Sequence, residues 1–420
     1  MRARYVYSAC IIVETQDVKV CCDPWFTPGA YHGSWYQYPP LGRDPIGVIG
    51  PVDLVYISHI HPDHYDPQFL RSYLEAHPNA RIVIGETSPA HLARKMQLDG
   101  FEPDVIHEEI FGDTQVTIVP NNAYAEIDNL DTALVVRRGE LSVVNMNDNP
   151  FDEQQIRRVL RVVGGRPRVA FLPYSAAGPY PQTYEFTDQA AQLAAADHKR
   201  EEFLALYSRY VEALRPHRAV PFAGTYYLGG PLAKLNTLRG VPDALAALER
   251  EPDVTVALAD GGDAFIDART LEASATRTNP YNPADVNRYL ADLSFFGYDY
   301  EREIVPLDGR SLPIGPLLST AYSRAVARSS VAERFWFCLT VHPGVFWCFD
   351  VSHDSGVQIR SDVSELKPRL ELTLDERYLF GLLTRLYHWS NARIGSHYQA
   401  RRVPDVYRRE VFEFLNYLQV

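Results

Sequence analysis

Cysteine is scarce in this sequence, with five in 420 residues, at positions 10, 21, 22, 338 and 348. No two of them form a C-x-x-C pair, so neither a thiolate zinc ribbon nor a disulfide framework is indicated. Cys21 and Cys22 are adjacent in an expected strand, where they point to opposite faces and serve as packing residues. Few and unpaired cysteines are typical of a reducing compartment, so we expect a cytoplasmic protein.

Long apolar runs and excess positive charge are also missing. No stretch reaches the roughly 18 apolar residues that a membrane helix needs, so we expect no membrane span. The apolar stretch near the N-terminus is too short for a signal peptide and is interrupted by Glu14. The net charge of −12 argues against a nucleic-acid partner. One basic cluster, ARRVPDVYRRE at 400–410, is typical of a solvated helix face, although it could hold an anionic substrate.

The chain does contain enough apolar residues, 46 % of the total, for a large core. β-Branched and aromatic segments predict strands early in the chain, and helical spacing occurs between them without a regular alternation. This pattern favours an α+β arrangement of stacked sheets flanked by helices. The segments expected as strands are 5–14, 18–25, 51–61, 80–86, 115–122, 132–149, 168–174, 218–224, 334–341 and 344–351. The segments expected as helices are 62–78, 88–100, 152–163 and 188–216.

Histidine is sparse too, with 13 in the chain, yet three occur within the six residues HIHPDH. His59 and His61 are two apart at the end of an expected strand, so both can face one cation. The chain turns at Pro62, and we expect Asp63 and His64 to open the next helix and face a second cation. Imidazole and carboxylate are ligands for zinc, iron or manganese. The alternative is a hydrogen-bonded turn with incidental histidines.

The spacing H-x-H-x-D-H resembles the signature of the metallo-β-lactamase superfamily. Further segments, in order along the chain, resemble the catalytic module of the CMP-N-acetylneuraminate (CMP-sialic acid) hydroxylases. They are DPWFTPGAYHGSWYQYPP, DLVYISHIHPDH, LDTALVV with NMNDN, FLPYSAAGPYPQTY, PFAG and RIGSHYQARRVPDVY. The resemblance implies an αββα four-layer sandwich over residues 1–270 and a mixed C-terminal region, 271–420, packed on it.

The resemblance also implies roles for individual residues. The superfamily's metal ligands fall on His59, His61, Asp63 and His64. The aspartate that bridges two metals falls on Asp148, whose alternative role is an Asx-turn residue that closes a strand. Asp23 falls on an aspartate near the site that is usually structural.

Two histidines of the superfamily have no counterpart, one before LDT and one after PFAG. Glu126, Asp128, His397 or His32 could replace them, or one metal could be held firmly and another loosely. Oxygen-rich ligation favours iron or manganese over zinc. We therefore expect one or two divalent metal ions, with iron favoured.

Two loops could border the substrate. The aromatic loop GAYHGSWYQYPP could wall a pocket, or pack as a surface loop against the C-terminal region. The turn-rich segment SAAGPYPQTY could let backbone approach a ligand, or be an ordinary loop.

The hydroxylases carry a Rieske iron–sulfur domain, which needs paired cysteines and histidines, and this sequence has no such pairs. We therefore expect electrons to come from a separate protein or from the substrate. We favour a non-haem iron oxygenase acting on a small polar substrate. The alternatives are a metal-dependent hydrolase, with Asp63 as the catalytic residue that orients a metal-bound hydroxide, and a binding protein that has lost its metal.

Overall fold

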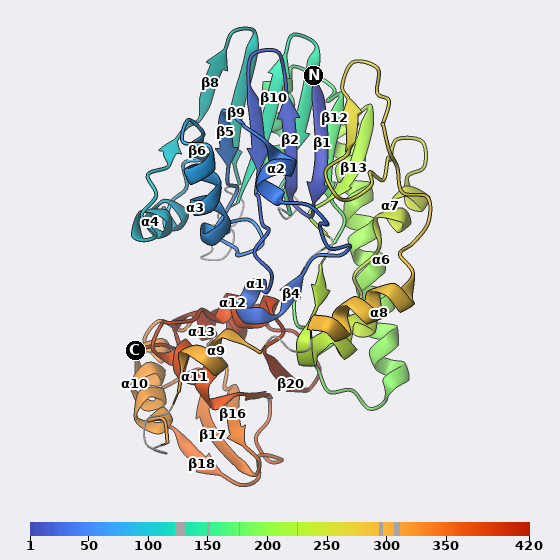
Figure 1. Cartoon of the computed structure of the whole chain (residues 1–420). Coiled ribbons are helices and arrows are strands. Elements are labelled where there is room, and N and C mark those ends of the chain that lie inside the picture. Colours follow the sequence, from blue (N-terminus) through green and yellow to red (C-terminus); the bar gives the residue numbers. More distant parts are fainter. Residues whose placement is uncertain (122–130, 149–151, 176, 225, 294–296, 306–310) are drawn as a thin grey trace.

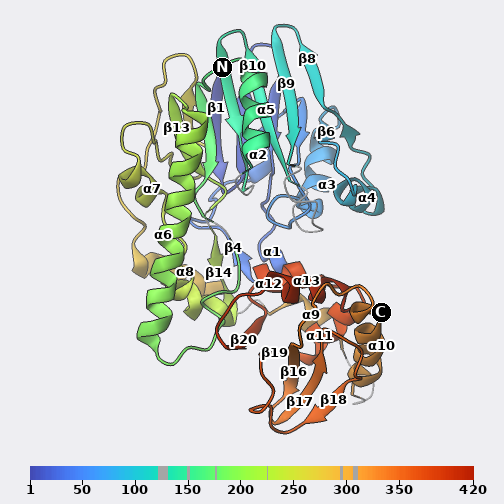
Figure 2. The same cartoon turned by 180° about the vertical axis from the view of Figure 1, so that it is seen from behind.

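The computed structural model describes residues 1–121, 131–148, 152–175, 177–224, 226–293, 297–305 and 311–420. The N-terminal region contains a pair of β-sheets that stack face to face, and helices cover the outer side of each sheet (Figure 1, Figure 2). This four-layer arrangement is the metallo-β-lactamase fold, an α+β class, as expected from the sequence. A third sheet with its own helices forms the C-terminal region below the sandwich in Figure 1.

The first sheet of the sandwich has seven strands, and side chains alternate between its two faces. Val20 and Cys22 point into the core between the two sheets, whereas Cys21 points to the helices outside, which confirms their expected packing. In spatial order the strands are β15 (Ala264–Asp267), β1 (Arg2–Tyr7), β2 (Cys10–Glu14), β3 (Lys19–Cys22), β5 (Leu54–Tyr56), β6 (Arg81–Ile84) and β7 (Asp104–Val105).

Three helices cover the first sheet, α2 (Pro45–Ile49), α3 (Pro67–Ala76) and α4 (His91–Leu98). The side chain of Asp66 accepts a hydrogen bond from the Phe69 backbone, and Pro67 occupies the first turn, so α3 begins there. The expectation that Asp63 and His64 open this helix is therefore wrong. Both residues lie in the turn before the helix, because the N-cap stands at residue 66.

The second sheet has six strands, and α5 (Glu153–Val163), α6 (Gln189–Leu214) and α7 (Ala244–Arg250) cover its outer face. β10 and β11 form a hairpin whose turn uses Gly139 in the left-handed region, at φ +59°. In spatial order the strands are β13 (Arg218–Phe222), β12 (Val169–Pro173), β11 (Leu141–Asn145), β10 (Thr132–Arg138), β9 (Thr114–Pro120) and β8 (Glu108–Phe111).

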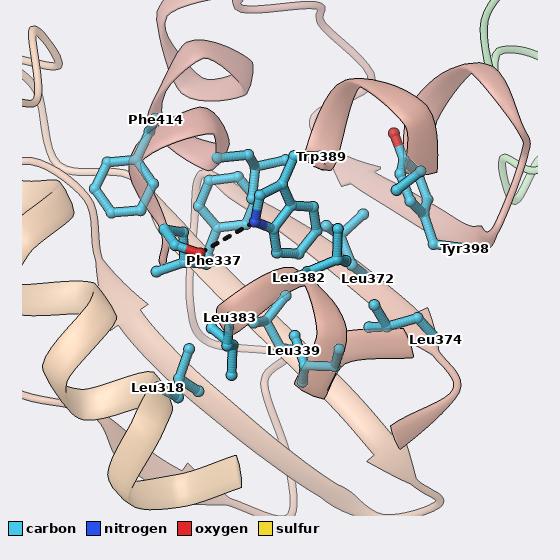
Figure 3. Packing of buried hydrophobic residues seen from close by; sticks show 14 of the residues in the cluster. Leu318, Phe337, Leu339, Leu372, Leu374, Leu382, Leu383, Trp389, Tyr398 and Phe414 are labelled. Carbon is cyan, nitrogen blue, oxygen red and sulfur yellow. Dashed lines mark hydrogen bonds between the residues drawn. The ribbon is translucent and has the colours of Figure 1, made fainter. Parts of the chain in front are cut away.

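The C-terminal region is built on a five-stranded sheet with a separate apolar core (Figure 3). In that core the indole of Trp389 donates a hydrogen bond to the Leu418 carbonyl at 3.1 Å. The strands in spatial order are β18 (Gln358–Arg360), β17 (Val345–Asp350), β16 (Trp336–His342), β19 (Arg369–Leu374) and β20 (Tyr398–Val403). The helices are α9 (Asp299–Glu303), α10 (Ile314–Val326), α11 (Glu376–Leu383), α12 (Trp389–Ile394) and α13 (Arg409–Tyr417).

Short elements connect the sandwich to the C-terminal region. The indole of Trp35 in β4 donates to the Ile394 carbonyl of α12 at 3.3 Å. Tyr36 of the same strand packs on Val286 and Leu290 of the connecting helix α8. The connecting elements are α1 (Ala30–Gly33), β4 (Trp35–Tyr36), β14 (Tyr227–Leu228), the 3₁₀ helix η1 (Gly230–Leu238) and α8 (Pro283–Asp292).

The length and apolar character of each helix determine whether it could span a membrane. Among the residues that the structure describes, no helix combines the length and apolar character required to cross a bilayer.

Shortening a buried side chain of the C-terminal core should destabilise the protein. Leu339 of β16 is fully buried, so Leu339→Ala should lower the free energy of unfolding by about 2–5 kcal/mol through lost contacts and a cavity. Ile359 of β18, which is 72 % exposed in the same sheet, is the matched control, and its alanine variant should change stability by less than about 0.5 kcal/mol. Urea denaturation followed by tryptophan fluorescence measures both. Equal effects of the two substitutions would contradict this description of the core.

Candidate metal centre

The histidine cluster lies where strands of both sheets end. β3, β5 and β6 run parallel, so their carboxyl ends share one edge of the first sheet. After β5 the chain turns through Ser58, His59 and His61, and Asp148 follows the end of β11 beside them. This edge faces the C-terminal region (Figure 1).

The side chains predicted from the sequence meet at this edge. His59 Nε2 and His61 Nδ1 are 2.8 Å apart. Asp148 Oδ1 lies 3.9 Å from His59 Nε2 and 3.6 Å from His64 Nε2, and Asp63 Oδ2 lies 3.4 Å from His64 Nε2. One atom each of His59, His61 and Asp148 lies within 4.8 Å of the others. The five side chains converge, and their role as ligands stays a prediction.

The donor atoms fit a divalent cation. His64 Nε2 and Asp148 Oδ1 are buried and have no hydrogen-bond partner in the described residues, although each points toward the other across 3.6 Å. Buried polar atoms without partners are costly. A cation between these atoms and His59 Nε2 would satisfy them, and nitrogen with carboxylate oxygen suits zinc, iron or manganese.

Acidic residues behind the two deepest imidazoles fix which nitrogen faces the cluster. Asp23 Oδ2 is 2.9 Å from His64 Nδ1, which is the structural role expected for Asp23. Ser58 Oγ lies 2.9 Å from His59 Nδ1, and Asp131 Oδ1 lies 3.5 Å from the same atom. Each of these contacts occupies Nδ1 and turns Nε2 toward the cluster, as supporting residues of metal sites do.

His61 has the opposite orientation. Its Nδ1 faces His59, and its Nε2 lies 3.5 Å from the hydroxyl of Ser390 in α12. A residue of the C-terminal region therefore supports a side chain of the sandwich.

Our sequence reasoning missed Asp131 and Ser390. Asp131 carried a signal, because it stands in the segment LDT just before β10, the strand paired with β11. Ser390 carried none, since it lies 329 residues from His61.

Burial and crowding shift the protonation of the cluster. Burial raises the pKa of Asp131 well above its ordinary value, and the nearby Asp148 raises it further. Burial lowers the pKa of His59, and His64 and His61 add to that effect. For His64, burial lowers the pKa, but Asp148, Asp63 and Asp23 outweigh it and raise the pKa well above its ordinary value. A divalent cation would have to displace protons from these side chains. Metal affinity is therefore expected to fall as the pH is lowered.

Of the residues considered as replacement ligands, the two histidines lie away from the cluster. Glu126 and Asp128 are outside the described residues. His32 and His397 sit in a neighbouring aromatic cluster, with ring centroids 6.1 Å apart. His397 Nε2 donates to the Tyr31 carbonyl at 2.6 Å, so it supports the loop beside the site. Neither His32 nor His397 belongs to the group of possible metal-holding residues found among the described side chains.

A cavity of about 50 Å³ opens at His61, Asp63 and Asp148. Aromatic residues form part of its lining, and two of them, Trp35 and Tyr226, stack with centroids 3.4 Å apart and an interplanar angle of 4°. The cavity holds a few atoms, so a larger substrate requires these side chains to move. Both segments considered as pocket walls contribute to its lining, with Tyr31 and Trp35 from one and Ser175 and Ala177 from the other.

Comparisons with known proteins agree with this fold. Residues 2–161 match the family model described as the beta-lactamase superfamily domain. A protein named a Rieske 2Fe-2S iron-sulfur protein from Mycolicibacterium smegmatis is 28 % identical over 325 residues, covering 73 % of this chain and 61 % of that protein. The cytidine monophosphate-N-acetylneuraminic acid hydroxylase of Asterias rubens is 26 % identical over 258 residues, covering 58 % of this chain and 38 % of the hydroxylase.

Solved structures with a similar arrangement include hydrolases and a hydroxylase. The isothiocyanate hydrolase from Delia radicum gut bacteria aligns with a TM-score of 0.42 and 16 % identity, over 64 % of this chain and 99 % of that one. CmlA, a diiron beta-hydroxylase from Streptomyces venezuelae, aligns with a TM-score of 0.37 and 17 % identity, over 59 % of this chain and 49 % of that one.

The chain spans only 61 % of the length of the Mycolicibacterium protein. The activity of that whole protein is therefore not assigned to this chain. Residues 2–161 of the chain match the beta-lactamase superfamily domain, and the chain resembles the cytidine monophosphate-N-acetylneuraminic acid hydroxylase of Asterias rubens over more than half of its length.

Proposed function

We propose that this protein is a metal-dependent oxidoreductase that uses one or two iron ions to oxidise a small polar substrate. The observation that carries the proposal is the partly buried convergence of His59, His61 and His64 with Asp148 and Asp63 at one edge of the sandwich. Zinc and manganese are the other metals compatible with these donor atoms.

Two observations support iron. The cluster offers two carboxylates, since Asp63 and Asp148 lie 3.4 Å and 3.6 Å from His64 Nε2, and oxygen donors favour iron or manganese over zinc. The sequence resemblance to hydroxylases extends over 58 % of the chain in one relative, well beyond the 160-residue stretch matched by the superfamily model.

Bound iron would supply electron transfer and activation of dioxygen. His59, His61 and His64 would hold it through the nitrogens that face the cluster, together with the carboxylate of Asp148. The stacked Trp35 and Tyr226 line the small cavity, and exclusion of bulk water by a bound substrate would strengthen electrostatic interactions inside it.

Residues 271–420 contribute to this function in the proposal, because α12 lies against the site formed by residues 1–270. Electrons would come from a separate donor protein or from the substrate. The Rieske name of one relative supports a donor of the iron–sulfur type.

A metal-dependent hydrolase is the second candidate. Burial raises the pKa of Asp63, but His64 and a hydrogen bond from Tyr31 outweigh it and keep the pKa below its ordinary value. Asp63 is therefore ionised at neutral pH and could accept a proton from an attacking water as a catalytic residue.

Removing one imidazole tests the metal site. In His61→Ala the cluster loses one of its facing nitrogens, so metal affinity should fall by more than the roughly 10–100-fold typical of supporting residues. The measurement is metal per chain by mass spectrometry after purification without chelator. His198, whose side chain is 76 % exposed in α6, is the control, and its alanine variant should retain the wild-type amount. Equal metal in both variants would remove the basis of the proposal.

The reaction class is tested by loading the protein with ferrous iron or with zinc. The iron-loaded protein should change its optical absorption when mixed with air-saturated buffer, because the iron is oxidised, and His59→Ala should abolish that change. Zinc-loaded protein that hydrolyses esters or phosphodiesters under argon, together with no response of the iron form to dioxygen, would favour the hydrolase.

A further inference from the structure

The loop beside the metal centre has an unusual backbone. Tyr31 (φ 54°, ψ 55°) and His32 (φ 60°, ψ 37°) both adopt the left-handed region, which is uncommon for residues other than glycine. Such conformations persist where the surroundings over-determine them, often at functional sites. The surroundings here include the C-terminal region, because a Cβ added to Gly33 would lie 3.1 Å from the Gly297 carbonyl.

This backbone places the Tyr31 phenol at the metal centre. The hydroxyl donates a hydrogen bond to Asp63 Oδ1, and the side chain is buried beside the cavity that His61 and Asp148 also line. Asp63 Oδ2 is left to face His64 Nε2 at 3.4 Å. The hydrogen bond therefore determines which carboxylate oxygen of Asp63 points to the imidazole.

The Tyr31 backbone is in turn held from the C-terminal region. His397 follows α12, and its Nε2 lies 2.6 Å from the Tyr31 carbonyl oxygen, within hydrogen-bond distance. Because a carbonyl oxygen only accepts, Nε2 carries the proton. Burial lowers the pKa of His397 to about 4, so the imidazole is neutral at neutral pH and this tautomer is kept.

We infer that Tyr31 is a positioning residue that orients Asp63 at the metal centre, and that His397 holds Tyr31 in place from the C-terminal region. This inference rests on the proposed metal-dependent function. It assigns the C-terminal region a direct role in assembling the centre, through a chain of contacts from His397 to the Tyr31 carbonyl and from the Tyr31 phenol to Asp63.

The competing explanation is that Tyr31 and His397 only fill space in an aromatic cluster. Tyr378 separates the two explanations. It is fully buried, its ring centroid lies 4.6 Å from that of His397, and its hydroxyl has no hydrogen-bond partner among the described residues. Removing this hydroxyl changes the same cluster without touching Asp63.

The test compares Co²⁺ binding by the full chain and its variants, using competition with a chelating dye and the visible absorption of bound Co²⁺. Tyr31→Phe should weaken binding by about 10–100-fold and change the cobalt spectrum, whereas Tyr378→Phe should leave both unchanged. His397→Leu should reproduce the spectral change, and His397→Gln, which keeps an N–H donor, should restore the wild-type spectrum. Circular dichroism of the metal-free proteins checks that each variant is folded.

A wild-type affinity and spectrum in folded Tyr31→Phe would overturn the inference, as would equal effects of Tyr31→Phe and Tyr378→Phe. A wild-type protein that binds no Co²⁺ would contradict the proposed function instead. In that case, crystal structures of the metal-free wild-type and Tyr31→Phe proteins test the positioning role of Tyr31 independently of metal binding. The Asp63 carboxylate should turn away from His64 in the variant, and an unchanged orientation would overturn the positioning role.

Discussion

Carboxylates and imidazoles share a small and mostly buried volume where the strands of two sheets end. Burying these groups is costly unless opposite charge and hydrogen bonds compensate. Asp23, Ser58 and Asp131 occupy the outer nitrogens of the histidines, which leaves the inner atoms facing one another. This constraint motivates the proposed metal site, because a cation among the inner atoms would satisfy the unpaired ligand atoms and neutralise the crowded carboxylates.

The C-terminal region contributes residues to the site. Its own core, with Trp389 at the centre, holds α12 in place, and α12 brings Ser390 and the Ile394 carbonyl to His61 and Trp35. The elements that close the cavity therefore come from both the sandwich and the C-terminal region. Displacing the C-terminal region would therefore alter both the lining of the cavity and the contact that supports His61.

Much of the fold could be predicted from local pattern. The segments expected as strands overlap β3, β5, β6, β9 to β13, β16 and β17, and helical spacing located α3 to α6. The segment 5–14, expected as one strand, is instead divided between β1 and β2. The spacing of His59, His61 and His64 predicted their convergence, because neighbours in sequence at a strand end have few ways to point. The start of α3 was wrong by a few residues, since the cap at Asp66 decides it. Tyr31, Ser390 and the support from His397 could not be predicted, because each acts through a contact across tens or hundreds of residues that leaves no local period.

The most direct measurement is the anomalous X-ray scattering of crystals of this protein grown with ferrous iron under argon, collected on both sides of the iron absorption edge. The account predicts a peak within bonding distance of His59 Nε2, His61 Nδ1 and a carboxylate oxygen of Asp148, at one or two positions. Iron bound only elsewhere on the protein, or no peak among these side chains, would contradict it.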